Sequence, residues 1–263
     1  MAARADDDNI KSLVKIVAIL DCFSTDTRTL SLAEVSRLTG YPRSTAHRLL
    51  TSMRQVGLLE QDRERERYRL GIRLFTYGNT VLANMELHRE ARPFAKALSR
   101  MTGFTVRIAV FGGETAVVIH NEEPESVDRV LLNLLENAPL HCTSVGKAIL
   151  AFQAPEVLES VLKVPRQRYT DTTITEPGAL RAELEEIRKR GFAIDDGEHQ
   201  PGLHCIGAPI RDHTGRVIGG ISASASVLRW PEGRESAVAE MVVHHALLIS
   251  RRLGFEERLS ERA

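Results

Sequence analysis

The chain has 263 residues, no formal net charge, 43% hydrophobic residues and three cysteines. This length accommodates one large domain or two of ordinary size, and the composition is typical of a globular protein. Cys22, Cys142 and Cys205 show no CxxC spacing, which argues against a disulfide framework and a structural zinc cluster and fits a reducing compartment.

The chain start MAARADDDNIKS is acidic and has no apolar signal-peptide core, and no apolar run approaches the roughly 18 residues of a membrane span. We therefore expect a cytoplasmic protein with no membrane partner. Residues 1–9 show no apolar pattern and are expected to form a flexible tail. Residues 1–69 hold 12 Lys and Arg against 10 Asp and Glu, a small excess that weakly favours a polyanionic partner for this end.

Residues 10–70 show the pattern of a small helical domain. Apolar residues at near-helical spacing from Ile10 predict a first helix. In SLAEVSRLTG, Ser31 and Glu34 have the spacing of a capping box, and Gly40 is suited to end the helix in a left-handed conformation. In YPRSTAHRLLTSMRQVGLLE, Pro42 suits a helix start.

The helix that follows Pro42 is predicted to have two distinct faces. Its apolar residues fall at spacings of three and four, while a basic and hydroxylated set faces the other way. Two short helices joined by a tight turn, the second with such a face, indicate a helix-turn-helix that binds DNA bases and phosphates. The next segment, GLLEQDRERERYRLG, alternates and predicts a hairpin, the wing of a winged helix, with arginines along one side. The candidate DNA contacts are Ser31, Arg43, Ser44, Thr45, His47, Arg48, Arg63, Arg65 and Arg67.

The wing has a simpler alternative. Glu64 and Glu66 alternate with its arginines, so it is equally well interpreted as a solvated charged hairpin. Its position directly after a recognition-type helix favours contact with the DNA backbone.

The segments SLAEVSRLTGYPRSTAHRLLTSMRQVGLLE and YRLGIRLFTYG resemble the IclR family of bacterial transcriptional regulators. Within them, RSTAHRLL is similar to that family's recognition helix and YRLG to its wing exit. The resemblance extends over nearly the whole chain, through PLHCTSVGKAILA and GLHCIGAPIRDHTGRVIGGISAS.

Residues 71–98 predict a further helix, either a core helix of a neighbouring domain or, as the resemblance implies, a linker helix that pairs with its twin in a dimer. Residues 99–263 then form the second domain. Hairpins are predicted around Gly112-Gly113 and from Asp212 to Gly215, with helices near 145–153, 155–162, 178–190 and 232–252. This pattern predicts an α+β fold with an antiparallel sheet flanked by helices, and the resemblance implies a GAF-like effector-binding domain.

The stretch DDGEHQPGLHCIGAPI concentrates reactive residue types. Cys205 with His199, His204 and Asp195 admits a Cys-dependent hydrolase, a ligand-binding surface or an inert buried thiol. His204 adjoins Cys205 and points to the opposite face if this is a strand, which argues against catalysis. The spacing matches no zinc pattern, and the Gly-Lys pair of SVGKAIL lacks the rest of a phosphate loop. No cofactor or metal is expected, and His199 and His204 are left without a role.

The resemblance implies which residues line the small-molecule pocket. They are the pair before the Gly-Lys, an aspartate ten positions before the cysteine, that cysteine, an apolar residue beside it and two serines on the following strand: Ser144, Val145, Asp195, Leu203, Cys205, Ser222 and Ser224. Ser144 and Val145 are larger than the pair in glyoxylate-binding relatives, so a differently shaped pocket is expected.

Together these features predict a transcriptional regulator, not an enzyme. Its expected partners are double-stranded operator DNA, a small carboxylate effector and a second copy of itself, with a dimer of dimers left open. The rivals are a Cys-dependent hydrolase and a DNA-binding protein that responds to no ligand.

Overall fold

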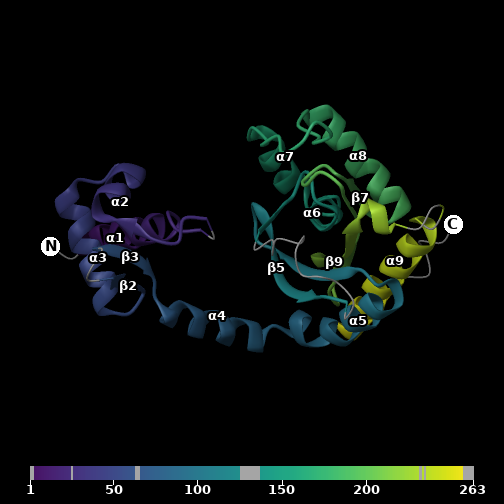
Figure 1. The fold of residues 1–263 in the computed structure, drawn as a ribbon, viewed down its shortest axis with the longest axis horizontal. Coiled ribbons are helices and arrows are strands. Elements are labelled where there is room, and N and C mark those ends of the chain that lie inside the picture. Colours follow the sequence, from purple (N-terminus) through teal and green to yellow (C-terminus); the bar gives the residue numbers. More distant parts are fainter. Residues whose placement is uncertain are drawn as a thin grey trace. The chain divides into compact units, whose positions relative to one another are not determined.

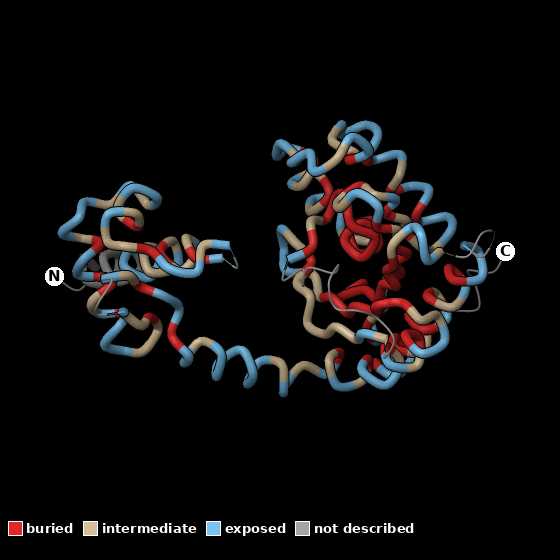
Figure 2. The backbone as a smooth tube through the Cα atoms, in the orientation of Figure 1, coloured by how far each residue is buried: buried red, intermediate tan, exposed pale blue. Residues whose placement is uncertain are grey.

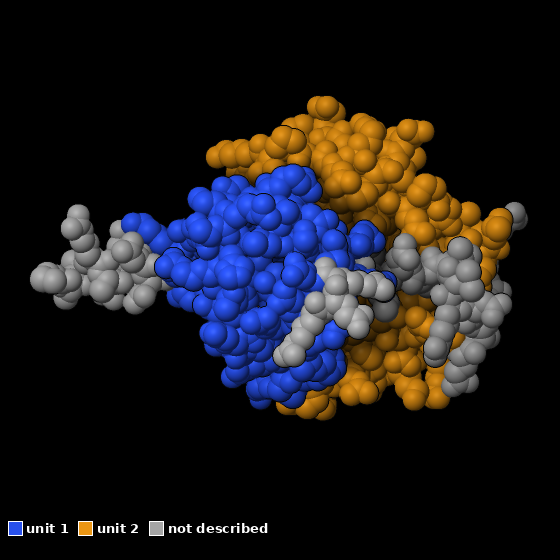
Figure 3. Space-filling model, turned by 60° about the vertical axis from the view of Figure 1, so that its left-hand side comes forward, with its two compact units in different colours: residues 1–84 blue, residues 85–263 orange. Residues whose placement is uncertain are grey.

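The computed structural model describes residues 3–24, 26–62, 66–124, 137–230, 233 and 235–256, with side chains from residue 11 onwards. The chain divides into two compact units, Met1–Asn84 and Met85–Ala263 (Figure 3). In the part described, no helix is long and apolar enough to cross a membrane.

The first unit is a helical domain with a small antiparallel sheet (Figure 1). Its sheet has the order β1-β3-β2, and its core includes Ile19, Val35, Leu50, Met53 and Tyr68. The predicted helix-turn-helix is present as α2 and α3, and the predicted hairpin as β2 and β3. The elements are α1 (Ala3–Leu20), β1 (Leu30–Ser31), α2 (Leu32–Thr39), α3 (Arg43–Gln55), β2 (Leu59–Asp62), β3 (Arg67–Leu70) and α4 (Ile72–Asn84).

The second unit is a six-stranded antiparallel sheet with helices on both faces. The strand order is β6-β5-β4-β9-β8-β7. The elements are α5 (Glu86–Thr102), β4 (Thr105–Phe111), β5 (Thr115–Glu122), β6 (Asn137–Pro139), α6 (Ser144–Leu150), α7 (Pro155–Lys163), α8 (Pro177–Arg190), β7 (Ala193–Asp196), β8 (Leu203–Arg211), β9 (Val217–Ser226), the short 3-10 helix η1 (Val227–Arg229) and α9 (Glu235–Arg252).

Two apolar cores lie on the two faces of this sheet, where the buried segments concentrate (Figure 2). On one face, α5 and α9 pack against alternate residues of β4, β8 and β9 such as Ile108, Ile206 and Ile221. On the other, which we call the α6 face, α6, α7 and α8 pack around Ile149 and Leu184. Side chains alternate along a strand. The residues of β4, β8 and β9 that adjoin Ile108, Ile206 and Ile221 in sequence therefore point to the α6 face.

Three of the expected boundaries differ in the structure. Helix α1 begins at Ala3, so most of the expected tail over residues 1–9 is helical; an existing helix extends past its apolar stripe at little cost once it has nucleated. The expected single linker helix over 71–98 is two helices, because Met85 has extended backbone (φ −77°, ψ 109°) and precedes a new helix start at Glu86. Helix α5 belongs to the second unit, which begins at Met85 rather than at residue 99.

Candidate functional site

The outward face of α3 carries the predicted DNA-contact residues. The helix buries Ala46, Leu49, Leu50 and Met53, which fixes the opposite face toward solvent. Arg43, Ser44, His47 and Arg48 are exposed and Thr45 is half-buried. None of these five side chains is hydrogen-bonded to another described residue, so their donors and acceptors are available to a partner.

Ser31, a predicted DNA contact, is also the N-cap residue of α2, as the Ser31–Glu34 spacing predicted. Its hydroxyl accepts a hydrogen bond from the Glu34 amide at 3.3 Å and donates one to the Glu34 carboxylate at 2.8 Å. The Ser31 amide donates to the same carboxylate at 2.7 Å, which lowers the pKa of Glu34 to about 2. The capping box therefore fixes the start of α2.

The described arginines of the wing are engaged within the domain. Arg67 forms an ion pair with Glu34 at 3.0 Å and donates to the Thr29 carbonyl at 2.9 Å. Arg69 pairs with Glu60 at 2.7 Å. The sequence offered no way to see these partners, because the Arg67 contacts join distant segments. Arg63 and Arg65 lie outside the described residues.

Across the second unit, four strands bring the predicted pocket residues into one row on the α6 face. Asp195 of β7 is opposite Cys205 of β8, Cys205 is opposite Ser224 of β9, and Ser224 is opposite Thr105 of β4. Directly opposed residues lie about 5 Å apart. The four side chains are buried, and Leu203 and Ser222 flank the row on the same face.

The start of α6 lies directly on this sheet because two strand positions are glycine. A Cβ added at Gly207 would lie 2.6 Å from the carbonyl carbon of Ser144, and one at Gly220 would lie 3.0 Å from Val145 Cγ2. Ser144 is buried, and Val145 packs into the core beneath α6. The glycines of GAP and IGG therefore position the predicted pair.

Asp195 is a buried carboxylate held by backbone amides. Its Oδ1 accepts from the amides of Glu198 at 2.8 Å and His199 at 3.4 Å. Burial raises the pKa of Asp195 to about 6, against the opposing effect of these amides and of Lys147. This carboxyl therefore changes charge near neutral pH.

Lys147 and Glu198 form a buried ion pair that sequence reasoning missed. Lys147, only 1% exposed, contacts the Glu198 carboxylate and lies 3.6 Å from Glu183. Burial raises the pKa of Glu198 to about 7 although Lys147 opposes the shift, and Glu198 Oε2 has no hydrogen-bond partner in the described part of the chain. The Gly-Lys pair identified Lys147, but no spacing rule links it to a residue 51 positions away.

The geometry does not support Cys205 as a nucleophile. Its side chain is 4% exposed, and burial raises its pKa to about 12, so the thiol stays protonated. His204 points to the other face, as predicted, where it lies 3.0 Å from Asp196 and 3.2 Å from Glu235 and contacts the Trp230 ring. Within the described part of the chain, no cluster of three metal-ligating side chains is found.

His199, which the sequence left without a role, lies at one end of a series of rings. Its ring is 4.7 Å from that of Tyr169, which is 6.1 Å from that of His141. Burial lowers the pKa of His199, and its Nδ1 has no hydrogen-bond partner among the described residues. The His199 backbone amide binds Asp195, while burial favours the neutral form of its imidazole.

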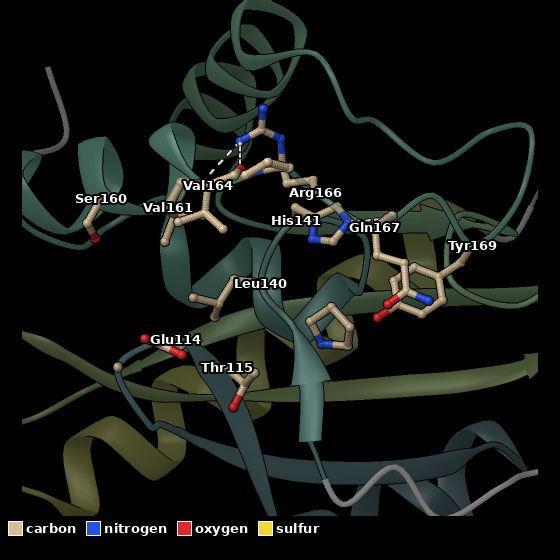
Figure 4. A pocket seen from close by; sticks show the side chains of 13 residues that line it. Glu114, Thr115, Leu140, His141, Ser160, Val161, Val164, Arg166, Gln167 and Tyr169 are labelled. Carbon is tan, nitrogen blue, oxygen red and sulfur yellow. Dashed lines mark hydrogen bonds between the residues drawn. The ribbon is translucent and has the colours of Figure 1, made fainter. Parts of the chain in front are cut away.

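Tyr169 and His141 also line a pocket of about 380 Å³ (Figure 4). The pocket lies between the β4–β5 turn, the end of β6 and the segment after α7. Arg166 is part of its lining, but its guanidinium already donates to the carbonyls of Val161, Leu162, Val164 and Thr175. That arginine holds the pocket wall in place.

Comparisons with known proteins agree with the resemblance seen in the sequence. The model of the bacterial transcriptional regulator IclR C-terminal domain matches residues 79–251, and that of the IclR helix-turn-helix domain matches residues 12–63. The chain belongs to the IclR family. As a member of this family it is a transcriptional regulator with a DNA-binding helix-turn-helix.

Individual relatives support the assignment along the whole chain. The HTH-type transcriptional regulator BhcR of Paracoccus denitrificans is 32% identical, over 98% of this chain and 92% of its own length. The Thermotoga maritima IclR structure is 31% identical with a TM-score of 0.67, covering 94% of this chain and 100% of that one. An IclR homologue from Microbacterium hydrocarbonoxydans, crystallised with 4-hydroxybenzoate, is 26% identical with a TM-score of 0.75, covering 92% and 98%.

Proposed function

We propose that this IclR-family regulator binds operator DNA through α3 and responds to a small carboxylate bound on the α6 face. The observation that carries the first part is the outward face of α3, whose Arg43 and Arg48 are exposed and make no side-chain hydrogen bond to a described residue. The second part rests on the buried polar row of Asp195, Cys205 and Ser224.

Recognition of DNA by α3 follows from the chemistry of its exposed face. Arginine donates two parallel hydrogen bonds to a guanine edge or one to a phosphate, and hydroxyl side chains bind phosphate. Ser44 and Thr45 lie in the first turn of α3, where the helix N-terminus also attracts phosphate. Of the wing arginines, Arg63 and Arg65 would add contacts to the DNA backbone, whereas Arg67 is held by Glu34 and the Thr29 carbonyl.

This interface is tested with DNA that the purified protein selects from a pool of random duplexes. Replacing Arg43 or Arg48 by alanine weakens binding to the selected DNA by about 1–3 kcal/mol if the residue contacts a base. Arg54 is the matched control, because it is exposed on the same helix but donates to Gln61. If both the Arg43→Ala and Arg48→Ala variants bound DNA with wild-type affinity, α3 would not be the recognition helix.

A carboxylate effector is supported by the polar, buried character of the α6 face and by the relative that was crystallised with 4-hydroxybenzoate. Effector binding would leave the α3 face unchanged. Replacing Ser222 by alanine should therefore blunt the response to effector while DNA affinity is kept.

Coupling between the two sites requires two arrangements of a dimer. Helix α4 buries none of its residues and exposes Ile72 and Phe75, so we propose that it pairs with α4 of a second copy. Half-sites on DNA lie about 34 Å apart or a multiple of that distance. An effector that binds one arrangement better changes the spacing of the two recognition helices and hence DNA affinity. Dimers of this kind can pair further into a dimer of dimers.

A further inference from the structure

Arg107 is a buried cation that forms no ion pair with a described residue, although the charge of the nearby Glu123 carboxylate partly opposes the effect of burial on its pKa. It lies on β4, is 4% exposed, and points to the α6 face because Val106 and Ile108 pack on the other one. Its only side-chain hydrogen bond to a described residue is a long one, from Nη1 to Ser224 Oγ at 3.5 Å. Its Nε is buried and has no hydrogen-bond partner among the residues that the structure describes.

Two other partly or fully buried cations of this unit are satisfied. Lys147 is paired with Glu198 and has Glu183 nearby, and Arg166 donates to several backbone carbonyls. Burying an ionised group without a partner is costly, because the lost hydration is not replaced. Among these three cations, Arg107 therefore has the fewest contacts with described residues and the most free donor capacity.

The polar groups around Arg107 determine the chemical groups and the length that a ligand bound there must have. Arg107 reaches Ser224, and from Ser224 the row continues through Cys205 to Asp195. Ser224 and Asp195 lie two strand spacings of about 4.8 Å apart, so the Arg107 guanidinium at Ser224 and the Asp195 carboxyl are separated by roughly 10 Å. At the acidic end, Glu198 Oε2 also lacks a hydrogen-bond partner among the described residues.

We propose that Arg107 binds the carboxylate of the effector and that the acidic end of the row selects for monocarboxylates with a hydrogen-bond donor at the far end. This inference rests on the proposed effector function and names its ligand class. A guanidinium holds a carboxylate through two parallel hydrogen bonds. A second carboxylate at the far end of the ligand would face Asp195 and Glu198 and be repelled.

The test uses the full-length protein and its Arg107→Met, Arg107→Lys and Arg166→Met variants. Binding is followed by calorimetry and thermal shift with glycolate and 4-hydroxybenzoate, with the primary amide of each, and with terephthalate as a dicarboxylate. Pyruvate, an acid without a hydrogen-bond donor at its far end, should bind more weakly than glycolate. An acid that binds the wild-type protein should bind Arg107→Met at least about tenfold more weakly. Its amide and the dicarboxylate should bind much more weakly or not at all, and Arg107→Lys should fall between.

Stability without ligand separates ligand binding from a structural role. Removing an unpaired buried charge should leave the melting temperature of Arg107→Met unchanged or raise it. Arg166→Met, which leaves several carbonyls without their donor, should lower it. A large drop in the melting temperature of Arg107→Met would overturn the proposal, since the guanidinium would then be structural.

The remaining outcomes distinguish this inference from the function on which it rests. If an acid binds wild type and Arg107→Met equally, or if acid and amide bind alike, Arg107 is not the anion-binding residue although the effector function stands. If no compound of either kind binds the wild-type protein, the carboxylate-responsive function itself is overturned, and the assignment of Arg107 with it.

Discussion

Asp195 and Glu198 are carboxyls whose burial penalises their charged form, so ligand binding beside them depends on pH. The pKa of Asp195 is raised to about 6 and that of Glu198 to about 7. Both acids are therefore partly protonated near neutral pH, and a ligand carboxylate facing them would favour their protonated forms further. Binding of a dicarboxylate such as terephthalate should take up protons, and its affinity should increase as pH falls from about 8 to 6, by at most about tenfold per unit per proton.

The other titratable groups around Asp195 do not reverse the predicted increase in affinity as pH falls. Cys205 keeps its proton at these pH values, and His199 stays neutral because burial lowers its pKa. Lys147 is held by its carboxylate partners. In Asp195→Asn the dependence should weaken, leaving the part due to Glu198. Calorimetry in buffers of different ionisation enthalpy measures the protons taken up; release of protons on binding would contradict the prediction.

Thiol labelling tests the nucleophile interpretation of Cys205. Cys205 and Cys142 are buried and Cys22 is half-buried, and burial raises the pKa of all three thiols. In the native protein at pH 8, Cys205 should react with a disulfide reagent at least about a hundredfold more slowly than in the unfolded chain, because reaction requires an accessible thiolate. Mass spectrometry identifies the labelled residue. Rapid labelling of Cys205 would restore the hydrolase hypothesis.

At the residue scale, the sequence predicted side chains whose neighbours are local or whose pattern is periodic. The serines at 222 and 224 share a face because strand residues alternate. Arg107 was not predicted as a site residue, because a single arginine in an apolar strand matches no motif. Only the pairing of β4 with β9 brings it close to Ser224.

Among the elements, those with local start and stop residues were predicted well. The capping box of Ser31 and Glu34 and the left-handed Gly40 (φ 71°) are both present. The two long hairpins were also predicted correctly, because turn residues separate two apolar runs in each. The short strands β1, β6 and β7 were missed, because two to four residues carry too little periodicity to distinguish a strand from a loop.

The capping box gives a prediction for α2. Ser31→Ala removes the hydroxyl that accepts the Glu34 amide, at a cost of roughly 1 kcal/mol to the helix. Hydrogen exchange across residues 32–39 should accelerate by about fivefold. Ser31→Thr, which keeps the cap, is the control. Unchanged protection in Ser31→Ala would mean that the capping box contributes nothing measurable to α2.

The break between α4 and α5 shows where periodicity fails. Apolar residues continue through 71–98 with helical spacing, so one helix was expected. These apolar residues have different environments in the structure: Leu87 packs into the core on the sheet, whereas Ile72 and Phe75 are exposed. Apolar periodicity predicts a helix but not which domain covers its apolar face. The domain boundary at Met85 therefore could not be predicted from the sequence.

For the whole molecule, the exposed apolar residues of α4 are a feature that one chain leaves unexplained. Ile72, Phe75, Tyr77 and Val81 are between 48% and 71% exposed. A helix that buries none of its residues and exposes several large apolar ones marks an interaction surface. In the proposed homodimer, a second copy would cover the same residues on both chains, which is the usual symmetry of such an interface.

Charge on α4 should therefore separate the copies without unfolding them. In Phe75→Glu and Val81→Glu, sedimentation should shift from dimer to monomer, while circular dichroism stays that of the wild type because both side chains are exposed. Two linked half-site contacts bind more tightly than one, typically by two or more orders of magnitude, so affinity for a two-half-site operator should fall by at least about a hundredfold. Asn79→Glu, which adds the same charge at an exposed polar position of α4, should weaken binding far less. Dimers of undiminished stability in both apolar variants would place the interface elsewhere and remove α4 from the coupling between effector and DNA.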